Sequence, residues 1–202
     1  MVFGHDHVGH GDSQGERVQI SSFSEYTDPV ISQCQAKKEQ FPNLPLFIIG
    51  HSMGGLITLM VVLKEQESSL FDGVVLMGPL IQIAPESASS FQKMMAKVAS
   101  KVWPGLKVGS IEASKVTSDQ VRRGLGDCQY SEMFQEMVNA IMADQSNAKG
   151  VKALHGYVLL NTLNFIGENY AEMRTPYLLL HGEKDKICSV EGSKVCFLIK
   201  IS

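Results

Sequence analysis

A glycine-rich motif between two apolar segments is the strongest chemical signal in the sequence. It reads Gly50-His51-Ser52-Met53-Gly54-Gly55 and contains the pattern Gly-x-Ser-x-Gly. Between a strand and a helix, this pattern is typical of a nucleophile elbow, a tight turn that exposes a serine hydroxyl above a sheet. Gly50 and Gly54 must be small there, because a side chain would clash with the neighbouring backbone. The motif predicts Ser52 as the nucleophile of an acyl transfer, with a flexible turn that does no chemistry as the alternative.

The same turn predicts how negative charge would be stabilised during such a reaction. It places Ser52 at the N-terminus of the next helix, where the helix dipole favours an anion. The backbone N–H of Met53 can then donate a hydrogen bond to the oxygen of the attacked carbonyl. We therefore expect Met53 to be an oxyanion-hole donor.

A serine hydroxyl also needs a base, and the base needs an acid that orients it. In this arrangement the acid and the base follow the serine in the chain. Asp185 is the best candidate for the acid, because it lies just beyond the apolar run Tyr177–Leu180, and the carboxyl ends of such strands carry functional loops. Glu183 and Asp127 are weaker candidates, and a solvated turn aspartate is the alternative for Asp185.

The base is not assigned by the sequence. No histidine follows Asp185. His155 lies in a helical segment, His181 is close to Asp185 in the chain, and His51 lies inside the elbow, where we expect it to pack beside the serine.

A second histidine cluster lies near the start of the chain. His5, His7 and His10 alternate with Asp6 and Asp12 in a glycine-rich loop. Such a cluster raises the possibility of a metal site, but a loop of this kind more often forms a hydrogen-bonded surface beneath an active site. We expect no metal there.

The elements that must position these residues follow from the apolar runs. Short runs predict strands at Met1–Phe3, Leu46–Ile49, Gly73–Met77 and Tyr177–Leu180, and the second of these fits a strand that is buried on both faces. The continuous apolar stretch Leu56–Leu63 predicts a buried helix. Strand, helix and strand joined by tight loops form a βαβ unit, so we expect an α/β protein with a doubly wound, mostly parallel sheet.

Helical patterns fill the rest of the chain. Phe23–Phe41 predicts a helix with Pro29 in its first turn or at a kink. Residues 80–165 lack strand signals and carry two amphipathic stretches, ending at Val102 and at Met142. In the first stretch, Lys93, Lys97 and Lys101 form a separate face, which is most simply a solvated one.

Composition excludes several classes of protein. The 202 residues are 44% apolar and 19% charged, with a formal net charge of −3, which supports a buried core and argues against nucleic-acid binding. No apolar run is long enough to span a membrane, and no secretory signal is evident. The four cysteines have no Cys-x-x-Cys spacing. We expect a soluble, cytoplasmic protein.

Several segments together resemble the monoacylglycerol lipase family of serine hydrolases. The resemblance covers most of residues 1–194 and is loose over 109–143. The segments that carry it are His5–Arg17, Gly50–Gly55, Pro79-Leu80, Pro85–Ala88 and His181–Cys188.

The resemblance implies an α/β-hydrolase core, formed by residues 1–79 and 166–202, with a helical cap inserted at 80–165. It implies hydrolysis of a monoacylglycerol ester to a fatty acid and glycerol, without a metal or an organic cofactor. Ser52 matches the nucleophile, Asp185 the triad acid and Met53 the oxyanion donor, while Cys188 matches a thiol near the acid. The cap would contact membranes peripherally and line an acyl-chain pocket with flexible apolar side chains, for which the candidates are Met94, Met95 and Val98.

The sequence also departs from this family. The family's histidine lies on a later loop and its His-Gly-x-Gly-type oxyanion loop follows an earlier strand, and neither is present in these residues. Residues 195–202 are apolar and β-branched, where the family has a polar helical sequence. One alternative is therefore a catalytically incompetent truncated isoform or gene-model fragment. Another is a lysophospholipase or general carboxylesterase, because the elbow does not fix the leaving group.

Overall fold

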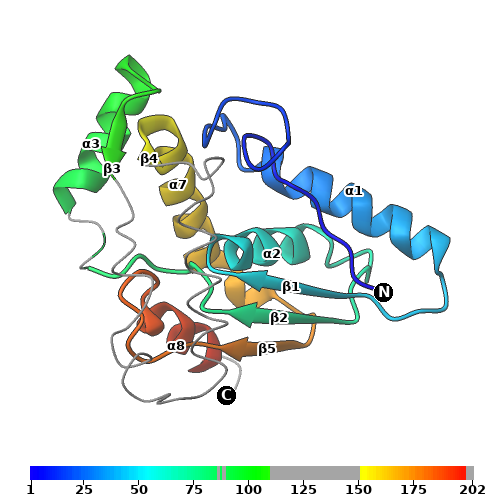
Figure 1. Ribbon diagram of the computed structural model, residues 1–202. Helices are drawn as coiled ribbons and strands as arrows, with labels where there is room; N and C mark the ends of the chain where they lie inside the picture. Colours follow the sequence, from blue (N-terminus) through cyan, green and yellow to red (C-terminus); the bar gives the residue numbers. More distant parts are fainter. Residues whose placement is uncertain (86, 88–89, 110–150, 199–202) are drawn as a thin grey trace, which may run out of the picture.

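Three of the expected strands form one parallel sheet in the computed structural model, which describes residues 1–85, 87, 90–109 and 151–198. The strands are β1 (Phe47–His51), β2 (Gly73–Met77) and β5 (Tyr177–Leu180), hydrogen-bonded in the order β1-β2-β5. Ile49 pairs with Val75, and Val75 pairs with Leu178. All three strands end at the same edge of the sheet, and their arrowheads point to the same side in Figure 1.

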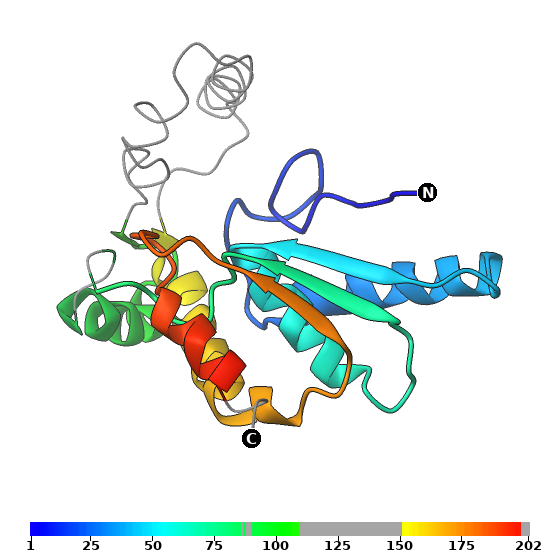
Figure 2. The same ribbon diagram turned by 90° about the horizontal axis from the view of Figure 1, so that it is seen from below.

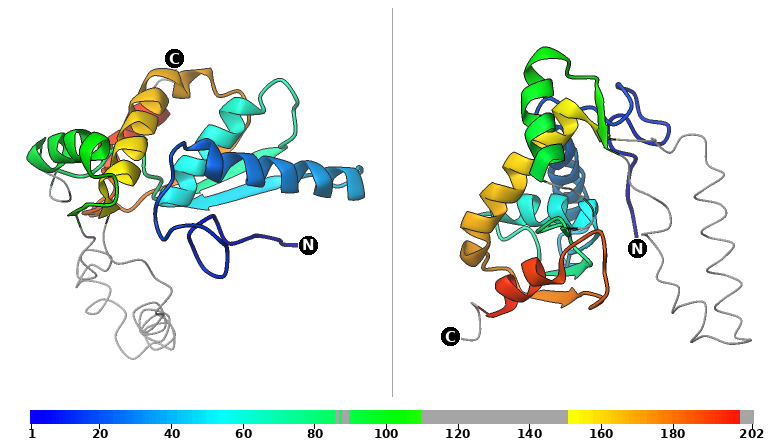
Figure 3. Two further views of the ribbon diagram at one scale, coloured as in Figure 1. Left: turned by 90° about the horizontal axis from the view of Figure 1, so that it is seen from above. Right: turned by 90° about the vertical axis from the view of Figure 1, so that its left-hand side faces the viewer.

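The βαβ unit predicted from the sequence is confirmed. Helix α2 (Met53–Lys64) connects β1 to the parallel strand β2 and buries seven of its residues, with Leu56, Leu59 and Val61 almost fully inaccessible. A helix that is apolar on all sides belongs in a core. It packs between the sheet and helix α1 (Ser24–Gln40), which lies on the same side of the sheet (Figure 3, left).

Helix α1 occupies the segment expected to be helical. The Glu25 carboxylate accepts the backbone N–H groups of Ser21 and Ser22, at 2.7 and 3.1 Å, which satisfies donors just before the helix begins. Pro29 is the sixth residue of the helix, so of the two positions expected for it the first turn is wrong, and a kink there stays a prediction.

One face of the sheet is exposed, which corrects the expectation that β1 is buried on both faces. Phe47 is 59% exposed and Ile49 67%, and Leu178 and Leu180 on β5, the opposite edge strand, point to the same face of the sheet. Successive side chains of a strand point to opposite faces. Among the described residues, helices α1 and α2 cover only one of those faces, and the other faces the viewer in Figure 2.

The start of the chain is also different from the expectation. Met1–Phe3 is extended but forms no strand, and residues 4–22 form a looped segment that returns to α1. Gly9 and Gly11 have φ angles of 70° and 48° there, a region that other residues rarely adopt.

The remaining helices, except for the short turn before β5, lie toward the carboxyl edge of the sheet (Figure 1). They are α3 (Ser90–Val102), α7 (Ala153–Asn169), the 3₁₀ turn η1 (Tyr170–Glu172) and α8 (Val190–Leu198), with the antiparallel pair β3 (Lys107–Gly109) and β4 (Val151–Lys152) beside them. α3 packs on α7 through the buried Ala96 and Ala99. α7 is continuous across position 165, where the cap was expected to end, and the domain division stays a prediction.

Parts of the expected insertion lie outside the described residues, among them the second amphipathic stretch, Cys128 and Asp127. The described core is one apolar cluster between the sheet, α1, α2 and α7, with Tyr26, Leu76 and Ile166 near its centre. No helix in the described part of the chain has the length and hydropathy needed to cross a bilayer.

Candidate active site

Ser52 lies in the sharp turn that the sequence predicts. It follows β1 and precedes α2 with φ of 54° and ψ of −118°, an unusual conformation for a residue with a side chain. The Ser52 N–H donates to the carbonyl of Met77 at 3.1 Å, and the Ser52 carbonyl accepts the N–H of Leu80 at 2.9 Å. The end of β2 and the residues after it therefore hold the elbow on both sides.

The glycines around Ser52 have different roles. A Cβ atom at Gly50 would lie 2.4 Å from the carbonyl oxygen of Gly54 and from the Thr58 hydroxyl, and one at Gly55 would lie 2.6 Å from the Pro79 ring. Both glycines are required for close approach of the backbone. At Gly54, no described heavy atom lies within 4 Å of an added Cβ, so the predicted clash there is wrong.

Asp185 is held by the loop that follows β5. Its Oδ1 accepts the backbone N–H groups of Ile187 and Cys188, at 2.8 and 2.9 Å, and its Oδ2 lies 3.3 Å from His181 Nε2. The side chain is 27% exposed. Asp185 is therefore a fixed carboxylate with one open side, which differs from a solvated turn residue.

The loop that carries Asp185 pairs with the segment that leaves β2. The N–H of Ala84 donates to the carbonyl of Ile187 at 2.9 Å, and the N–H of Ser189 donates to the carbonyl of Gln82 at 2.7 Å. The Ser87 hydroxyl donates to the carbonyl of Lys186. Because the same β2 segment also holds the elbow, it joins the loops of Ser52 and Asp185 at one edge of the sheet.

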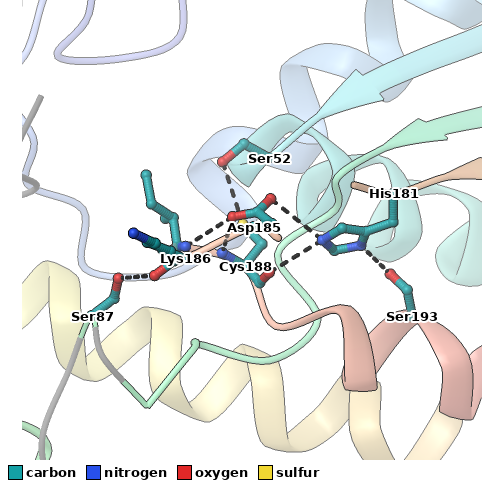
Figure 4. A network of polar contacts seen from close by, with 8 residues as sticks. Ser52, Ser87, His181, Asp185, Lys186, Cys188 and Ser193 are labelled. Carbon is teal, nitrogen blue, oxygen red and sulfur yellow. Dashed lines mark hydrogen bonds and ion pairs between the residues drawn. The ribbon is translucent and has the colours of Figure 1, made fainter. Parts of the chain in front are cut away.

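Cys188 connects the two loops directly. Its Sγ lies 3.7 Å from the Ser52 Oγ, and Figure 4 shows these side chains on the same side of the sheet edge as Asp185. Burial raises the pKa of the Cys188 thiol to about 11, so the thiol is neutral near pH 7. The contact places Ser52 beside the acid loop without adding a second anion.

The described histidines do not supply a base to this serine. Within the described part of the chain, the Ser52 hydroxyl contacts the Cys188 thiol and no imidazole. His181 pairs with Asp185, His155 lies 3.5 Å from the hydroxyl of Tyr26, and His51 is exposed. The base stays unassigned.

The predicted oxyanion donor and the predicted cap residues lie on two different helices, α2 and α3. Met53 is the first residue of α2, where helix geometry leaves a backbone N–H without an intrahelical partner, as an oxyanion donor requires. Met94 and Val98 lie on α3 and are 54% and 56% exposed, and the side chain of Met95 lies outside the described residues. The predicted roles of these four residues stay predictions.

The N-terminal histidines surround an aromatic side chain. The rings of His7 and His10 lie 5.2 and 5.8 Å from the ring of the buried Tyr26, and His5 packs edge-on against His7. Burial, with the neighbouring His5 and His10, lowers the pKa of His7 to about 4. The described residues contain no group of three metal-binding side chains placed to share an ion.

Sequence reasoning missed the partners of Asp185. His181 was considered only as a base, and Ser193, whose Oγ lies 2.6 Å from His181 Nδ1, was not considered at all. A histidine that ends a strand beside a candidate acid is the one signal that points to this contact. Ser193 lies on α8 and has no local signal.

The parallel sheet, the strained serine and the acid loop define the class of α/β-hydrolases, as the sequence predicted. A family model described as serine aminopeptidase, S33 (Hydrolase_4), matches residues 1–198. The chain belongs to this family.

Similar proteins are monoglyceride lipases, which confirms the resemblance. Human monoglyceride lipase is 32% identical over 194 residues, covering 96% of this chain and 58% of its own length. The monoacylglycerol lipase of Mycolicibacterium smegmatis is 29% identical over 196 residues, covering 96% of this chain and 64% of its own length. The chain therefore spans less than two thirds of these relatives.

Solved structures agree on the fold. The monoacylglycerol lipase of Paleococcus ferrophilus superposes with a TM-score of 0.73 at 23% identity, covering 95% of this chain and 65% of that structure. A soluble variant of the Saccharomyces cerevisiae monoglyceride lipase, in complex with a substrate analog, gives a TM-score of 0.69 at 19% identity, covering 96% of this chain and 62% of that structure.

Proposed function

We propose that this chain forms the catalytic framework of a serine hydrolase that cleaves monoacylglycerols to a fatty acid and glycerol. The observation that carries the proposal is the position of two loops at one sheet edge. Ser52 is held in a strained turn, and Asp185 is fixed beside it through Cys188. The monoglyceride lipases among its relatives supply the substrate class.

The proposed reaction follows the usual two steps of a serine hydrolase. Ser52 Oγ attacks the ester carbonyl carbon while its proton passes to a histidine that Asp185 orients. The oxyanion accepts the Met53 N–H, the carbon–oxygen bond to glycerol breaks, and the histidine returns the proton to the leaving oxygen. Water then attacks the acyl-enzyme in the same way, which releases the fatty acid and restores Ser52.

A second candidate function, a catalytically incompetent form of the hydrolase, is favoured by one observation. No imidazole contacts Ser52 among the described residues, so the 202-residue chain by itself would be catalytically incompetent. Loss of the base from a catalytic triad lowers kcat by about 10⁶-fold. In that case the protein with this sequence alone is an inactive form of the hydrolase.

One experiment tests both candidates. The protein is expressed as these 202 residues and, in parallel, with the sequence that flanks them in its transcript. We expect hydrolysis of 1-oleoylglycerol only in the longer form, lost in S52A and retained in E183Q. Turnover by the short form that S52A abolishes contradicts the incompetent candidate. A longer form that cleaves lysophosphatidylcholine in preference to 1-oleoylglycerol contradicts the proposed substrate.

We further infer that helix α3 contacts a lipid surface. Met94, Val98 and Val102 follow one another at four-residue spacing and therefore share a face, and all three are more than half exposed. Trp103 adds a large exposed ring at the end of the helix, and Lys97 and Lys101 are exposed nearby. Exposed apolar side chains flanked by lysines suit the interface of an anionic membrane.

A further inference from the structure

His181 has a polar partner at each of its two ring nitrogens. It follows β5 directly, and its side chain is only 4% exposed. Its Nε2 lies 3.3 Å from Asp185 Oδ2 and 3.1 Å from the carbonyl oxygen of Cys188, while its Nδ1 lies 2.6 Å from Ser193 Oγ (Figure 4). Both ring nitrogens are therefore occupied.

The partners determine which nitrogen carries the hydrogen. The carbonyl of Cys188 can only accept, so Nε2 is the donor in that hydrogen bond, and Asp185 Oδ2 lies 3.3 Å from the same nitrogen. In the neutral ring, Nδ1 is then an acceptor, and the hydroxyl of Ser193 donates to it. A ring fixed at both ends cannot rotate without breaking a partly buried hydrogen bond, which costs about 1–3 kcal/mol.

The fixed ring limits the positions open to the carboxylate. Asp185 Oδ1 is already bonded to two backbone N–H groups, and Oδ2 faces His181 on one side. Gly78 approaches the same oxygen, since a Cβ there would lie 3.5 Å from Oδ2. What remains is one lone-pair direction of Oδ2 that can accept a further N–H donor.

We infer that His181 is a positioning residue, which holds the Asp185 carboxylate in the orientation that receives the N–H of the catalytic base, while Ser193 fixes the His181 ring. The catalytic consequence rests on the proposed function, but the contact itself does not. His181 does not touch Ser52, so its effect on the reaction passes through Asp185. Through the carbonyl of Cys188, the same ring also steadies the residue whose thiol meets Ser52.

The contact is tested without any reaction by NMR of protein labelled with ¹⁵N-histidine. We expect one slowly exchanging imidazole N–H signal assigned to Nε2 of His181 near neutral pH. D185N should shift that signal, because an acceptor oxygen is lost or replaced by an amide group. The matched control is E183Q, an exposed acid in the same loop, which should leave the signal unchanged. Protonation at Nδ1 alone, or a signal unaffected by D185N, overturns the inference.

The catalytic effect is tested with a pair of isosteres in the form of the protein that hydrolyses ester. Glutamine places its amide nitrogen near the position of Nε2, whereas asparagine places its own near Nδ1. We therefore expect H181Q to keep kcat within about 3-fold of wild type and H181N to lower kcat by up to about 100-fold, with KM unchanged in both, since a misplaced catalytic group reduces rate by such factors.

Folding is separated from positioning in the same experiment. Rates are normalised to the fraction of folded protein found by thermal unfolding, because His181 is buried and both variants lose stability. Equal normalised kcat values for H181N and H181Q overturn the inference. If the wild-type protein hydrolyses no ester, the proposed function fails, and the NMR comparison of D185N with E183Q alone decides whether His181 holds Asp185.

Discussion

Ser52 combines two properties that rarely occur together, a positive φ and a position between a buried strand and a buried helix. A non-glycine residue in such a conformation costs about 1–3 kcal/mol and persists only where its surroundings require it. Here the surroundings are Gly50 and Gly55, which let the backbone close around the serine, and the hydrogen bonds to Met77 and Leu80. The strained conformation of Ser52 therefore depends on Gly50 and Gly55, which no residue with a side chain can replace without a clash.

Two glycine substitutions at the elbow should have different effects on stability. In G50A the new methyl group meets the carbonyl of Gly54 and the Thr58 hydroxyl, so we expect the free energy of unfolding to fall by about 1–3 kcal/mol. In G54A the methyl group has space in a helix, so we expect no loss or a gain of up to about 1 kcal/mol. Urea denaturation measures both, and a loss in G54A as large as in G50A would contradict this account.

Two histidines, the buried His155 and the partly buried His7, make stability depend on pH. Burial lowers the pKa of His7 and of His155 from 6.5 to about 4, with His10 adding to the shift of His155. The unfolded chain therefore binds protons that the folded chain does not between these pH values. The free energy of unfolding should be highest above pH 6.5 and should fall as the pH is lowered toward 4.

Thermal unfolding between pH 7 and pH 4.5 checks this dependence. H155Q removes one of the two rings, so its stability should fall less steeply than that of wild type, by up to about 1.4 kcal/mol for each pH unit. H51Q is the control, since His51 is exposed, and it should keep the wild-type slope. A wild-type slope in H155Q would mean that this ring does not titrate as described.

At the scale of elements, the carboxyl edge of the sheet gathers the candidate site, while α3 extends an exposed apolar face away from α7. Only Ala96 and Ala99 are buried among the described side chains of α3, and the row formed by Met94, Val98 and Val102 is open. One face of the helix therefore packs in the protein, and the other is the exposed apolar face for which we propose contact with lipid.

A charge placed on that open row should weaken membrane binding. V98E should lower the affinity for vesicles that contain phosphatidylserine by roughly 10-fold, because burial of a valine in the interface is lost. Trp103 is the single tryptophan of the sequence, so its fluorescence reports binding directly. L44E is the control at another exposed apolar residue, in the loop between α1 and β1. Equal binding by V98E and wild type would contradict the proposed contact.

At the scale of the whole molecule, the features that depend on local sequence could be predicted, whereas those that depend on long-range packing could not. The apolar runs predicted β1, β2, β5 and α2 because buried strands and helices need continuous apolar sequence, and the Gly-x-Ser-x-Gly motif predicted the turn at Ser52. The open space at Gly54 and the bonding of His181 to Ser193 depend on residues that tertiary structure brings together. The sequence carries no periodicity that reports such contacts.

The exposed sheet face was missed for a related reason. An all-apolar run such as Leu46–Ile49 has the same sequence whether one face of its strand or both are covered. Phe47 and Ile49 face outward because no described helix lies on their side, whereas Ile48 points to the core. The sequence of the strand therefore shows that it is apolar, but it does not show whether one face of the sheet or both are covered.

Neighbouring positions on β1 should respond differently to a polar substitution in the 202-residue chain. I49T should change the free energy of unfolding by less than about 0.5 kcal/mol and increase the soluble yield, because its side chain is already exposed. I48T should lower it by about 1–3 kcal/mol, because a hydroxyl enters the core. Urea denaturation separates them, and equal losses at the two positions would show that the outer face is covered.

The central claim is that Ser52 and Asp185 act together at one edge of the sheet, and covalent labelling tests it most directly. The protein expressed with its transcript's flanking sequence is treated with a fluorophosphonate, and the modified peptide is identified by mass spectrometry. We predict a phosphonate on Ser52, no label in S52A, and a labelling rate in D185N reduced by about 10⁴-fold, as for other triads that lose the acid. Labelling at another residue, or a D185N rate equal to wild type, would contradict the claim.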